Sequence, residues 1–240
     1  MKKIFILLIF VISLFGDEFE DFDSELSTKK VSDPLSSYNR VMTDFNDGLY
    51  INVLQPVSNG YIAITHKEVR KSVDRFFENL YFPKRCINNL LQGKFSFALE
   101  ETGRFLINST IGILGLFDPA KSEFGLESHN EDFGQTLGFY GVGSGPHIVL
   151  PLFGPSNLRD MLSMYPDVIV SPIDSSVGTE RKDYTLSTTY LEYMAIRSLQ
   201  IINKTSLNMD KYDKMRDDAV DLYPYLRDIY EQRRAKEIGE

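Results

Sequence analysis

The chain has 240 residues, of which 42% are hydrophobic and 25% charged, and its formal net charge is −8 at pH 7. This acidic balance excludes attraction to nucleic acid or to an anionic lipid surface through net charge. The length suits one domain with a substantial core or two small ones, and the single cysteine, Cys86, excludes an intramolecular disulfide.

The first 16 residues have the pattern of an export signal. Lys2 and Lys3 precede a mostly apolar run over residues 4–15, and Gly16 is followed by an acidic segment. As a helix this run would measure about 18 Å, too short for a hydrocarbon core of about 30 Å. We therefore predict a signal peptide over residues 1–16, removed after Gly16. A retained anchor is the alternative.

Residues 17–32 are predicted to form an acidic, disordered linker. Residues 17–33 hold seven acidic residues, two lysines and few apolar side chains, too few to bury a core. No cysteine near Gly16 is available to carry the acyl chains of a lipoprotein. We expect any membrane attachment to rest on apolar surface of the folded part.

Periodic apolar residues predict helices from Asp33 onward. A recurrence every three to four residues over 33–57 indicates one face of an interrupted helix, and Thr65 with Glu68 has the spacing of a capping box before an amphipathic run to Leu80. Short apolar and amphipathic runs follow over 87–91 and 95–106. The second continues without a charge to Phe117, so a helix over 105–117 would be about 20 Å long, enough to enter one leaflet.

The composition of the segment 133–158 differs clearly from that of the whole chain, of which 25% is charged. It has no formal charge, and it holds 6 of the 16 glycines and 3 of the 10 prolines. Glycine and proline oppose a long helix, so we predict an apolar loop or hairpin, preceded by a capping box at Ser128 and Glu131. Helices are expected over 158–165 and 186–201, and a charged helix or tail over 223–240. The chain should be mostly helical.

No pattern indicates catalysis. His66, His129 and His147 are isolated from other metal-ligand types. Ser144 lacks the flanking glycines of a nucleophile elbow, and Gly141 to Pro146 lack the spacing of a dinucleotide-binding loop. We therefore predict no metal, no cofactor and no enzymatic activity.

Several blocks of residues stand in a characteristic order and spacing: Asp33-Pro34-Leu35, Tyr38-Asn39-Arg40, Phe45-Asn46-Asp47, Asn88 to Gly93, Arg104 to Gly112, Gly115 to Pro119, Glu131 to Gly138, Gly141 to Pro146, and Leu158-Arg159-Asp160. Over residues 33–234 they resemble the MlaA/VacJ family of outer-membrane phospholipid-transport lipoproteins. The resemblance implies an all-α, ring-like assembly of amphipathic and interfacial helices around a central channel, over a domain of residues 33–222 followed by the tail 223–240.

Family membership would imply the following function. Such a protein lies in the periplasmic leaflet of the outer membrane of a Gram-negative bacterium, removes phospholipids from the outer leaflet, passes them to a periplasmic lipid-carrier protein and binds a trimeric porin. The channel and hinge hairpin would comprise Gly141, Val142, Gly143, Ser144, Gly145, Pro146, Ile148, Leu150, Pro151 and Phe153. Membrane-interfacial residues would be Tyr38, Met42, Phe45, Leu49, Phe105, Ile111, Ile113, Leu114, Leu116 and Phe117.

Alternatives remain at each step. The glycines of 141–145 would serve as hinges or merely as tight turns, and the interfacial helices as membrane anchors or ordinary core. A porin-associated envelope scaffold that conducts no lipid is the second functional hypothesis. A surface phospholipase, for which no nucleophile and base are found, is the third. The tail from Tyr223 to Arg234 is a candidate docking segment for the carrier.

Overall fold

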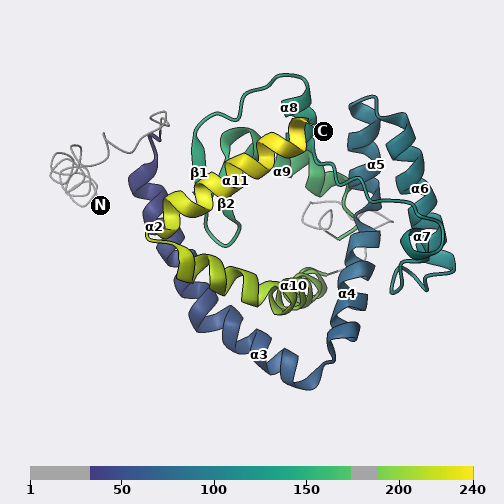
Figure 1. Cartoon of the computed structure of the whole chain (residues 1–240), viewed down its shortest axis with the longest axis horizontal. Coiled ribbons are helices and arrows are strands. Elements are labelled where there is room, and N and C mark those ends of the chain that lie inside the picture. The colour runs from purple at the N-terminus through teal and green to yellow at the C-terminus, as the bar shows by residue number, and fades with distance from the viewer. Residues whose placement is uncertain (1–32, 174–188, 240) are drawn as a thin grey trace, which may run out of the picture. The chain divides into compact units, whose positions relative to one another are not determined.

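A computed structural model describes residues 33–173 and 189–239, which are mostly helical (Figure 1). The predicted signal peptide 1–16 and linker 17–32 lie outside the described residues. The elements are α2 (Ser36–Leu49), the π-helical η1 (Tyr50–Leu54), α3 (Gln55–Ile64), α4 (Lys67–Leu80), α5 (Phe82–Leu91), α6 (Phe95–Thr110), α7 (Pro119–Ser122), α8 (Phe133–Phe139), β1 (His147–Leu150), β2 (Gly154–Asn157), α9 (Leu158–Val170), α10 (Tyr190–Asp218) and α11 (Leu222–Gly239).

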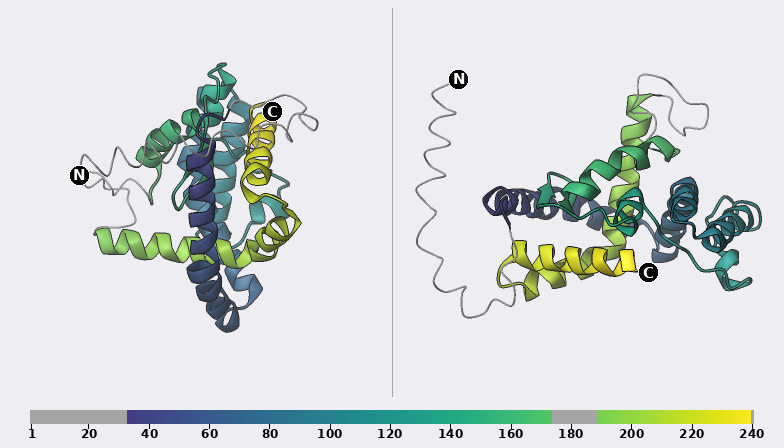
Figure 2. Two further views of the ribbon diagram at one scale, coloured as in Figure 1. Left: turned by 90° about the vertical axis from the view of Figure 1, so that its left-hand side faces the viewer. Right: turned by 90° about the horizontal axis from the view of Figure 1, so that it is seen from above.

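The elements of residues 35–240 follow one another around a closed circuit (Figure 1). Packing contacts run from α2 through η1 to α3, from α4 through α5 to α8 and α9, and then through β2 and β1 back to α2. Helix α10 packs on α3 and α4, while α11 packs on α8, α2 and β2. In both views of Figure 2 the axis of α10 runs at a steep angle to the axes of α2 and α11. The predicted ring-like, mostly helical fold is confirmed.

The helical periods are confirmed, but both predicted capping boxes are wrong. Thr65 donates its hydroxyl to the carbonyl of Tyr61, one turn back, and α4 begins after His66 without a side-chain cap. Ser128 hydrogen-bonds to Glu101, and Asp132 caps α8 by accepting from the amide of Gln135 at 2.8 Å. The hydroxyl of Thr65 is therefore taken by a local carbonyl, and that of Ser128 by a carboxylate distant in sequence.

The predicted helix over 105–117 is also wrong beyond Thr110. Helix α6 ends there, and residues 111–117 form a series of turns in which Ile113, Leu114 and Gly115 have φ values of 54°, 58° and 91°. The amide of Gly115 donates to the carbonyl of Asn108 at 2.7 Å. A Cβ at Gly115 would collide with the side chain of Asn79. Only glycine allows this close return of the chain.

The interior is unusually polar. The largest fully buried side chains include Asn39, Asn88, Asn89, Asn157, Asn203 and Glu101, whereas many Ile, Leu and Phe side chains are exposed. Glu101 receives Arg85 at 2.7 Å and the amide of His129 at 2.6 Å, so its charge is paired. Buried polar groups are stable only when hydrogen-bonded. No helix among the described residues is both long and apolar enough to cross a membrane.

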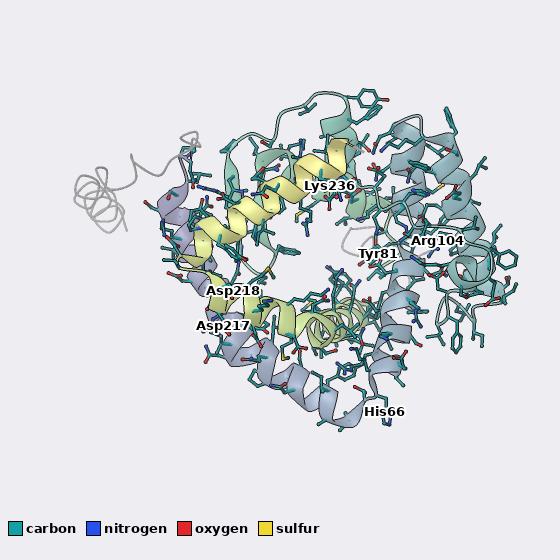
Figure 3. The ribbon with its side chains drawn as sticks, viewed as in Figure 1. His66, Tyr81, Arg104, Asp217, Asp218 and Lys236 are labelled. Atoms are coloured by element: carbon teal, nitrogen blue, oxygen red, sulfur yellow. The ribbon has the colours of Figure 1, made fainter. Side chains whose placement is uncertain are left out.

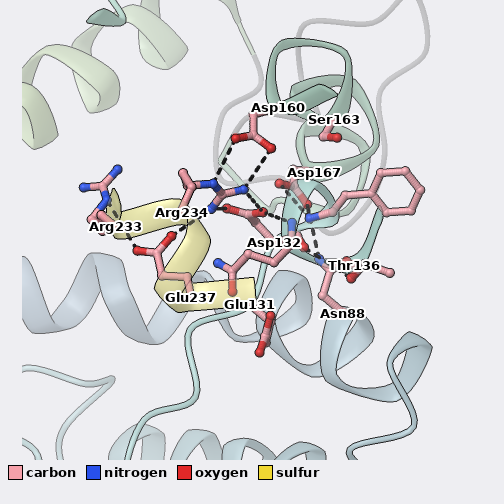
Figure 4. Close-up of polar contacts among 12 residues, drawn as sticks. Asn88, Glu131, Asp132, Thr136, Asp160, Ser163, Asp167, Arg233, Arg234 and Glu237 are labelled. Carbon is pink, nitrogen blue, oxygen red and sulfur yellow. Dashed lines mark hydrogen bonds and ion pairs between the residues drawn. The ribbon is translucent and has the colours of Figure 1, made fainter. Parts of the chain in front are cut away.

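Helix α11 is fastened to α8 and α9 by Arg234 (Figure 4). Its buried guanidinium donates to Asp160 at 2.9 Å and, through two nitrogens, to Asp132 at 2.9 Å. Burial alone would raise the pKa of Asp160, but hydrogen bonds from Arg234, Arg159 and Tyr230 lower it to about 2. A Cβ at Gly134 would lie 2.6 Å from Arg234, so this glycine admits the guanidinium.

Asp167 of α9 is a third carboxylate in this region and is half-buried (Figure 4). It accepts from the amide of Phe133 and from the side chain of Asn88, both at 3.2 Å. Burial, with a smaller contribution from Asp132, raises its pKa from 3.8 to about 6. The folded state therefore holds this proton more tightly than the unfolded chain, and ionisation of Asp167 opposes folding.

We expect Arg234→Met to lower the free energy of unfolding by about 3–5 kcal/mol, because Asp132 loses its guanidinium partner and the buried Asp160 keeps only Arg159 as an ion-pair partner among the described residues. Chemical denaturation at neutral pH measures the difference. The control is Arg233→Met, at a neighbouring side chain that is mostly exposed, where a change within about 0.5 kcal/mol is expected. Equal losses in the two variants would refute the role of Arg234.

We expect Asp167→Asn to remove a pH dependence of stability. In the wild type the contribution of Asp167 is present below pH 4 and is lost as pH rises to about 6. The variant should therefore gain up to about 3 kcal/mol at pH 7 relative to wild type and nothing at pH 4. Unfolding at both pH values tests this, with the exposed Asp44→Asn as control. A gain that is the same at both pH values would contradict the assignment.

Candidate functional site

The later part of the uncharged segment 133–158 folds into a β-hairpin, β1 and β2, between α8 and α9. Strands β1 and β2 are antiparallel, with His147 opposite Asn157 and Leu150 opposite Gly154. The loop before β1 is tied at both ends: the amide of Val142 donates to Leu137 of α8 at 3.0 Å, and the amide of Arg159 in α9 donates to Ser144 at 3.1 Å. The predicted hairpin is confirmed over residues 147–157, whereas the prediction is wrong over residues 133–139, which form α8 after the cap at Asp132.

The glycines of this loop differ in their requirements. Gly141 and Gly145 have φ values of 83° and 68°, which glycine adopts without strain. Gly143 has no positive φ, and a Cβ at Gly141 or Gly143 would meet nothing within 4 Å. At Gly145 a Cβ would lie 3.1 Å from Leu158. Turn geometry therefore explains two of these glycines, and Gly143 is left without a steric reason.

Asn39 of α2 holds β1 in place. Its side-chain amide donates to the carbonyl of His147 at 3.1 Å and accepts from the amide of Val149 at 2.8 Å. It also donates to the hydroxyl of Tyr223 in α11 at 3.1 Å. The side chain is 0% exposed. Asn39 thus takes the place of a neighbouring strand for β1 and joins α2, β1 and α11 at one point.

Asn46 repeats this arrangement two turns along the same face of α2. Its amide nitrogen donates to the carbonyl of Leu150 at 3.0 Å, and its oxygen accepts from the amide of Leu152 at 2.8 Å. Residues seven apart share one face of a helix, so both asparagines face the hairpin. Asn39 holds the strand, and Asn46 holds the turn.

The hairpin turn exposes apolar side chains. Leu152 and Phe153 are 68% and 66% exposed, and Leu152 has a φ of 70°, which costs a non-glycine residue about 1–2 kcal/mol. Beneath the turn is a cavity of about 160 Å3. It is lined by Thr43, Asn46, Tyr50, Val149, Leu152, Phe153, Gly154, Pro155, Tyr212 and Leu226.

Two tyrosines close the cavity on the side of α10. Tyr50 donates to Asp213 at 2.8 Å, and Tyr212 donates to Asp47 at 3.2 Å. Burial and these neighbouring carboxylates raise the pKa of both tyrosines. Both hydroxyls therefore stay protonated as donors, and the cavity combines an apolar hairpin wall with neutral polar groups.

Each predicted hairpin residue has a defined position. Gly141, Val142, Gly143, Gly145, Pro151 and Phe153 are exposed, whereas Ser144, Pro146, Ile148 and Leu150 are half-buried. The hydroxyl of Ser144 donates to the carbonyl of Gly145 at 3.3 Å. No group of three or more His, Cys, Asp or Glu in residues 33–173 and 189–239 could hold a metal ion.

The predicted interfacial residues are divided between surface and interior. Tyr38, Phe45, Ile111, Ile113, Leu114 and Phe117 are exposed, while Met42, Leu49, Phe105 and Leu116 are half-buried. The ring of Phe105 stacks on Phe82 with centroids 4.5 Å apart. The structure adds exposed residues that the sequence analysis did not select, among them Val41, Phe95, Leu99, Leu106, Leu152, Leu162 and Tyr165.

Comparison with known proteins decides the family. The sequence profile described as MlaA lipoprotein matches residues 31–237. The chain belongs to the MlaA family. A solved structure reported as the structural basis for maintenance of bacterial outer membrane lipid asymmetry matches with a TM-score of 0.72 and 28% identity, over 87% of this chain and 100% of that chain.

Two relatives show how far the similarity extends. An uncharacterized protein of Rickettsia prowazekii (strain Madrid E) is 34% identical over 229 residues, 82% of this chain and 91% of the relative. The intermembrane phospholipid transport system lipoprotein MlaA of Escherichia coli (strain K12) is 35% identical over 136 residues, 54% of this chain and 53% of that protein. The alignment thus covers about half of the length of the relatives that are named as phospholipid-transport lipoproteins.

The sequence did not predict the residues that position the hairpin, Asn39 and Asn46. Asn39 and Asn46 stand in the blocks that carry the resemblance, but no role was inferred for them. The available signal is their spacing: two amides seven residues apart interrupt a predicted apolar face. A buried amide on such a face requires a backbone partner from elsewhere in the chain.

We expect Asn39→Ala and Asn46→Ala to loosen different parts of the hairpin. Asn39→Ala should lower the free energy of unfolding by about 1–3 kcal/mol, because it leaves buried groups of His147 and Val149 unpaired. Asn46→Ala should cost less and should speed amide exchange at Leu152 more than at Val149. Hydrogen exchange and denaturation measure both effects.

The matched control is Asn52→Ala, because Asn52 is exposed and its side chain donates to the carbonyl of Gly48, one turn earlier, at 2.6 Å. It should alter neither stability nor hairpin exchange. Unchanged exchange at Val149 in Asn39→Ala would show that α2 does not hold the strand.

Proposed function

We propose that this protein is the outer-membrane component of an intermembrane phospholipid transport system. It removes phospholipids from the outer leaflet through an amphipathic passage and delivers them to a periplasmic carrier. The observation that carries the proposal is the hairpin, which is fastened into a ring of helices at its base while its apolar turn is exposed. The role named for the Escherichia coli relative supports the same pathway.

The distribution of side chains favours a location in lipid. Asparagines and charged pairs fill the interior, and Ile113, Leu114, Leu99 and Leu162 are exposed. A protein in water gains about 25 cal/mol for each Å2 of apolar surface that it removes from water, so exposed apolar surface of this extent indicates lipid or a protein partner. Attachment in the periplasmic leaflet covers such a surface without a helix that spans the bilayer.

In the proposed mechanism the hairpin gates the passage. The loop at 141–145 gives the arm its freedom, since Gly141 and Gly143 have open space where a side chain would stand. Pro146, Pro151 and Pro155 stiffen the arm beyond it. The lipid head group passes polar groups such as those of Tyr50 and Asn46, and the acyl chains slide along Leu152 and Phe153. No covalent step and no nucleotide take part.

The proposed partners are a trimeric porin in the membrane and a periplasmic lipid carrier. The surface of a porin would pack against the apolar helix faces that lipid does not cover. The carrier would bind the charged outer face of α11. Arg234 on this helix is buried, but the side chains of Arg233 and Asp228 are exposed to solvent. A truncation at Asp221 would remove Arg234, so charge substitutions on the outer face test carrier binding better.

We expect Gly143→Pro to raise surface-exposed phospholipid in a bacterium that depends on this protein. Proline fixes φ near −65°, and Gly143 is the loop glycine without a positive φ. The variant should therefore fold but move less. Labelling of outer-leaflet phospholipid measures asymmetry, and native mass spectrometry measures bound lipid.

The control is Gly143→Ala, which adds a side chain into open space and leaves the loop mobile. It should keep asymmetry close to wild type. Normal asymmetry in a folded, membrane-bound Gly143→Pro protein would contradict gating by the hairpin. Porin binding without any copurified lipid would favour the scaffold function instead.

A further inference from the structure

A groove of about 660 Å3 lies between α4, the turns of 111–118 and α7. It is lined by Arg75, Ile111, Phe117, Asp118, Pro119, Lys121 and Ser122. In Figure 1, α7 stands on the outer side of the circuit, on the side of α4 away from α10. Figure 3 places Arg104, which supports this region, on that same side. The groove is therefore separate from the hairpin and its cavity.

Two cations, Arg75 and Lys121, line the groove, and neither is held in a buried ion pair. Among the described residues, Arg75 makes no side-chain hydrogen bond or ion pair. Lys121 pairs only with Glu127, and both partners are mostly exposed, so this contact is weak and exchangeable. Asp74 and Glu68 lie near Arg75 on α4. Both carboxylates interact with the Arg75 guanidinium electrostatically, without a hydrogen bond.

The carboxylate in the groove is already satisfied. Asp118 accepts from Arg104 at 3.0 Å, from Asn108 at 2.9 Å and from the amide of Lys121 at 3.2 Å. Burial alone would raise its pKa, but these hydrogen bonds lower it below the usual value. Asp118 therefore neutralises Arg104 and leaves Arg75 and Lys121 available to an anion from outside.

The rim of the groove is apolar. Ile111 and Phe117 line it and are exposed, and the adjacent Ile113 and Leu114 are also exposed in left-handed backbone conformations. A left-handed conformation is unfavourable for a β-branched residue such as Ile113. The turn is nevertheless held by Gly115 against Asn79, so four apolar side chains remain directed outward beside two cations.

We infer that this groove binds the phosphate of an anionic phospholipid, whose acyl chains lie against Ile111, Ile113, Leu114 and Phe117. A cation pair next to an apolar surface matches the junction of head group and chains. The inference rests on the proposed membrane location, and it concerns a lipid held at the outer side of the ring rather than one that is transported. A protein with an overall negative charge thereby gains a local preference for anionic lipid.

Flotation of the purified full-length protein with vesicles tests the inference. The vesicles contain phosphatidylcholine alone or a mixture of phosphatidylcholine and phosphatidylglycerol. The wild type should bind the mixed vesicles more tightly. The double variant Arg75→Gln with Lys121→Gln should lose roughly tenfold or more of the affinity for mixed vesicles and keep its affinity for neutral ones.

Two matched variants separate the groove from general charge effects. Lys71→Gln with Lys211→Gln removes the same charge outside the groove and should bind mixed vesicles as the wild type does. Arg75→Lys with Lys121→Arg keeps the charges and should restore most of the preference. Equal losses in the groove variant and the charge-matched control would overturn the inference, as would an unchanged groove variant.

Two further outcomes identify the source of failure. If inorganic phosphate abolishes the preference more strongly than chloride at equal ionic strength, the groove is a site for free phosphate and the lipid assignment is overturned. If the wild type binds neither kind of vesicle, the proposed membrane location fails together with the inference. Binding to neutral vesicles without any preference overturns the groove alone.

Discussion

The fold depends on Asn39, a fully buried amide that joins three segments distant in sequence. Its bonds to β1 and to Tyr223 connect α2 with the hairpin and with α11. The contact between α2 and β1 closes the circuit of elements. A hydrophobic contact in the same place would allow the strand to slide. Hydrogen bonds to a carbonyl and an amide two residues apart fix its register.

The polar interior agrees with the proposed membrane location, in which the outer surface of the protein meets lipid. The hydrophobic effect cannot hold apolar helices together where the surroundings are equally apolar, so packing and hydrogen bonds must do so. Glu101 with Arg85, and Arg234 with Asp132 and Asp160, supply such bonds with charges fully paired. The exposed leucines and isoleucines then do not have to stabilise the ring, and they remain free to contact acyl chains.

The sequence predicted those features that arise from local periodicity. The apolar period over 33–57 and 67–80 indicated helices, and the glycines and prolines of 133–158 indicated the hairpin. The predictions failed where distant partners decide the structure. Glu101 takes the hydroxyl of Ser128 that was assigned to a helix cap. Asn79 meets Gly115 and turns the chain at 111–117, where the absence of charge had suggested a helix.

The sequence predicted which segment forms the hairpin but not which residues hold the hairpin in place. Composition alone located the loop at 141–145 and the arm beyond it. It gave no sign that α2 holds the strand through Asn39 and the turn through Asn46, because hydrogen-bond partners more than 100 residues away leave no local pattern. In the same way, Arg234 was predicted to belong to a charged tail that docks the carrier, although Gly134 makes room for its guanidinium in the interior.

Under the proposed gating mechanism, these supports set the order in which the hairpin opens to a lipid. The bonds of Asn46 lie at an exposed or half-buried turn, where water replaces a lost partner at little cost, whereas those of Asn39 are buried. Movement therefore begins at Leu152 and Phe153 and meets its greatest resistance at Val149. The left-handed conformation of Leu152 is relieved when the turn is released. A lipid that contacts the turn acts on the part of the hairpin that yields first, and the ring stays closed behind it.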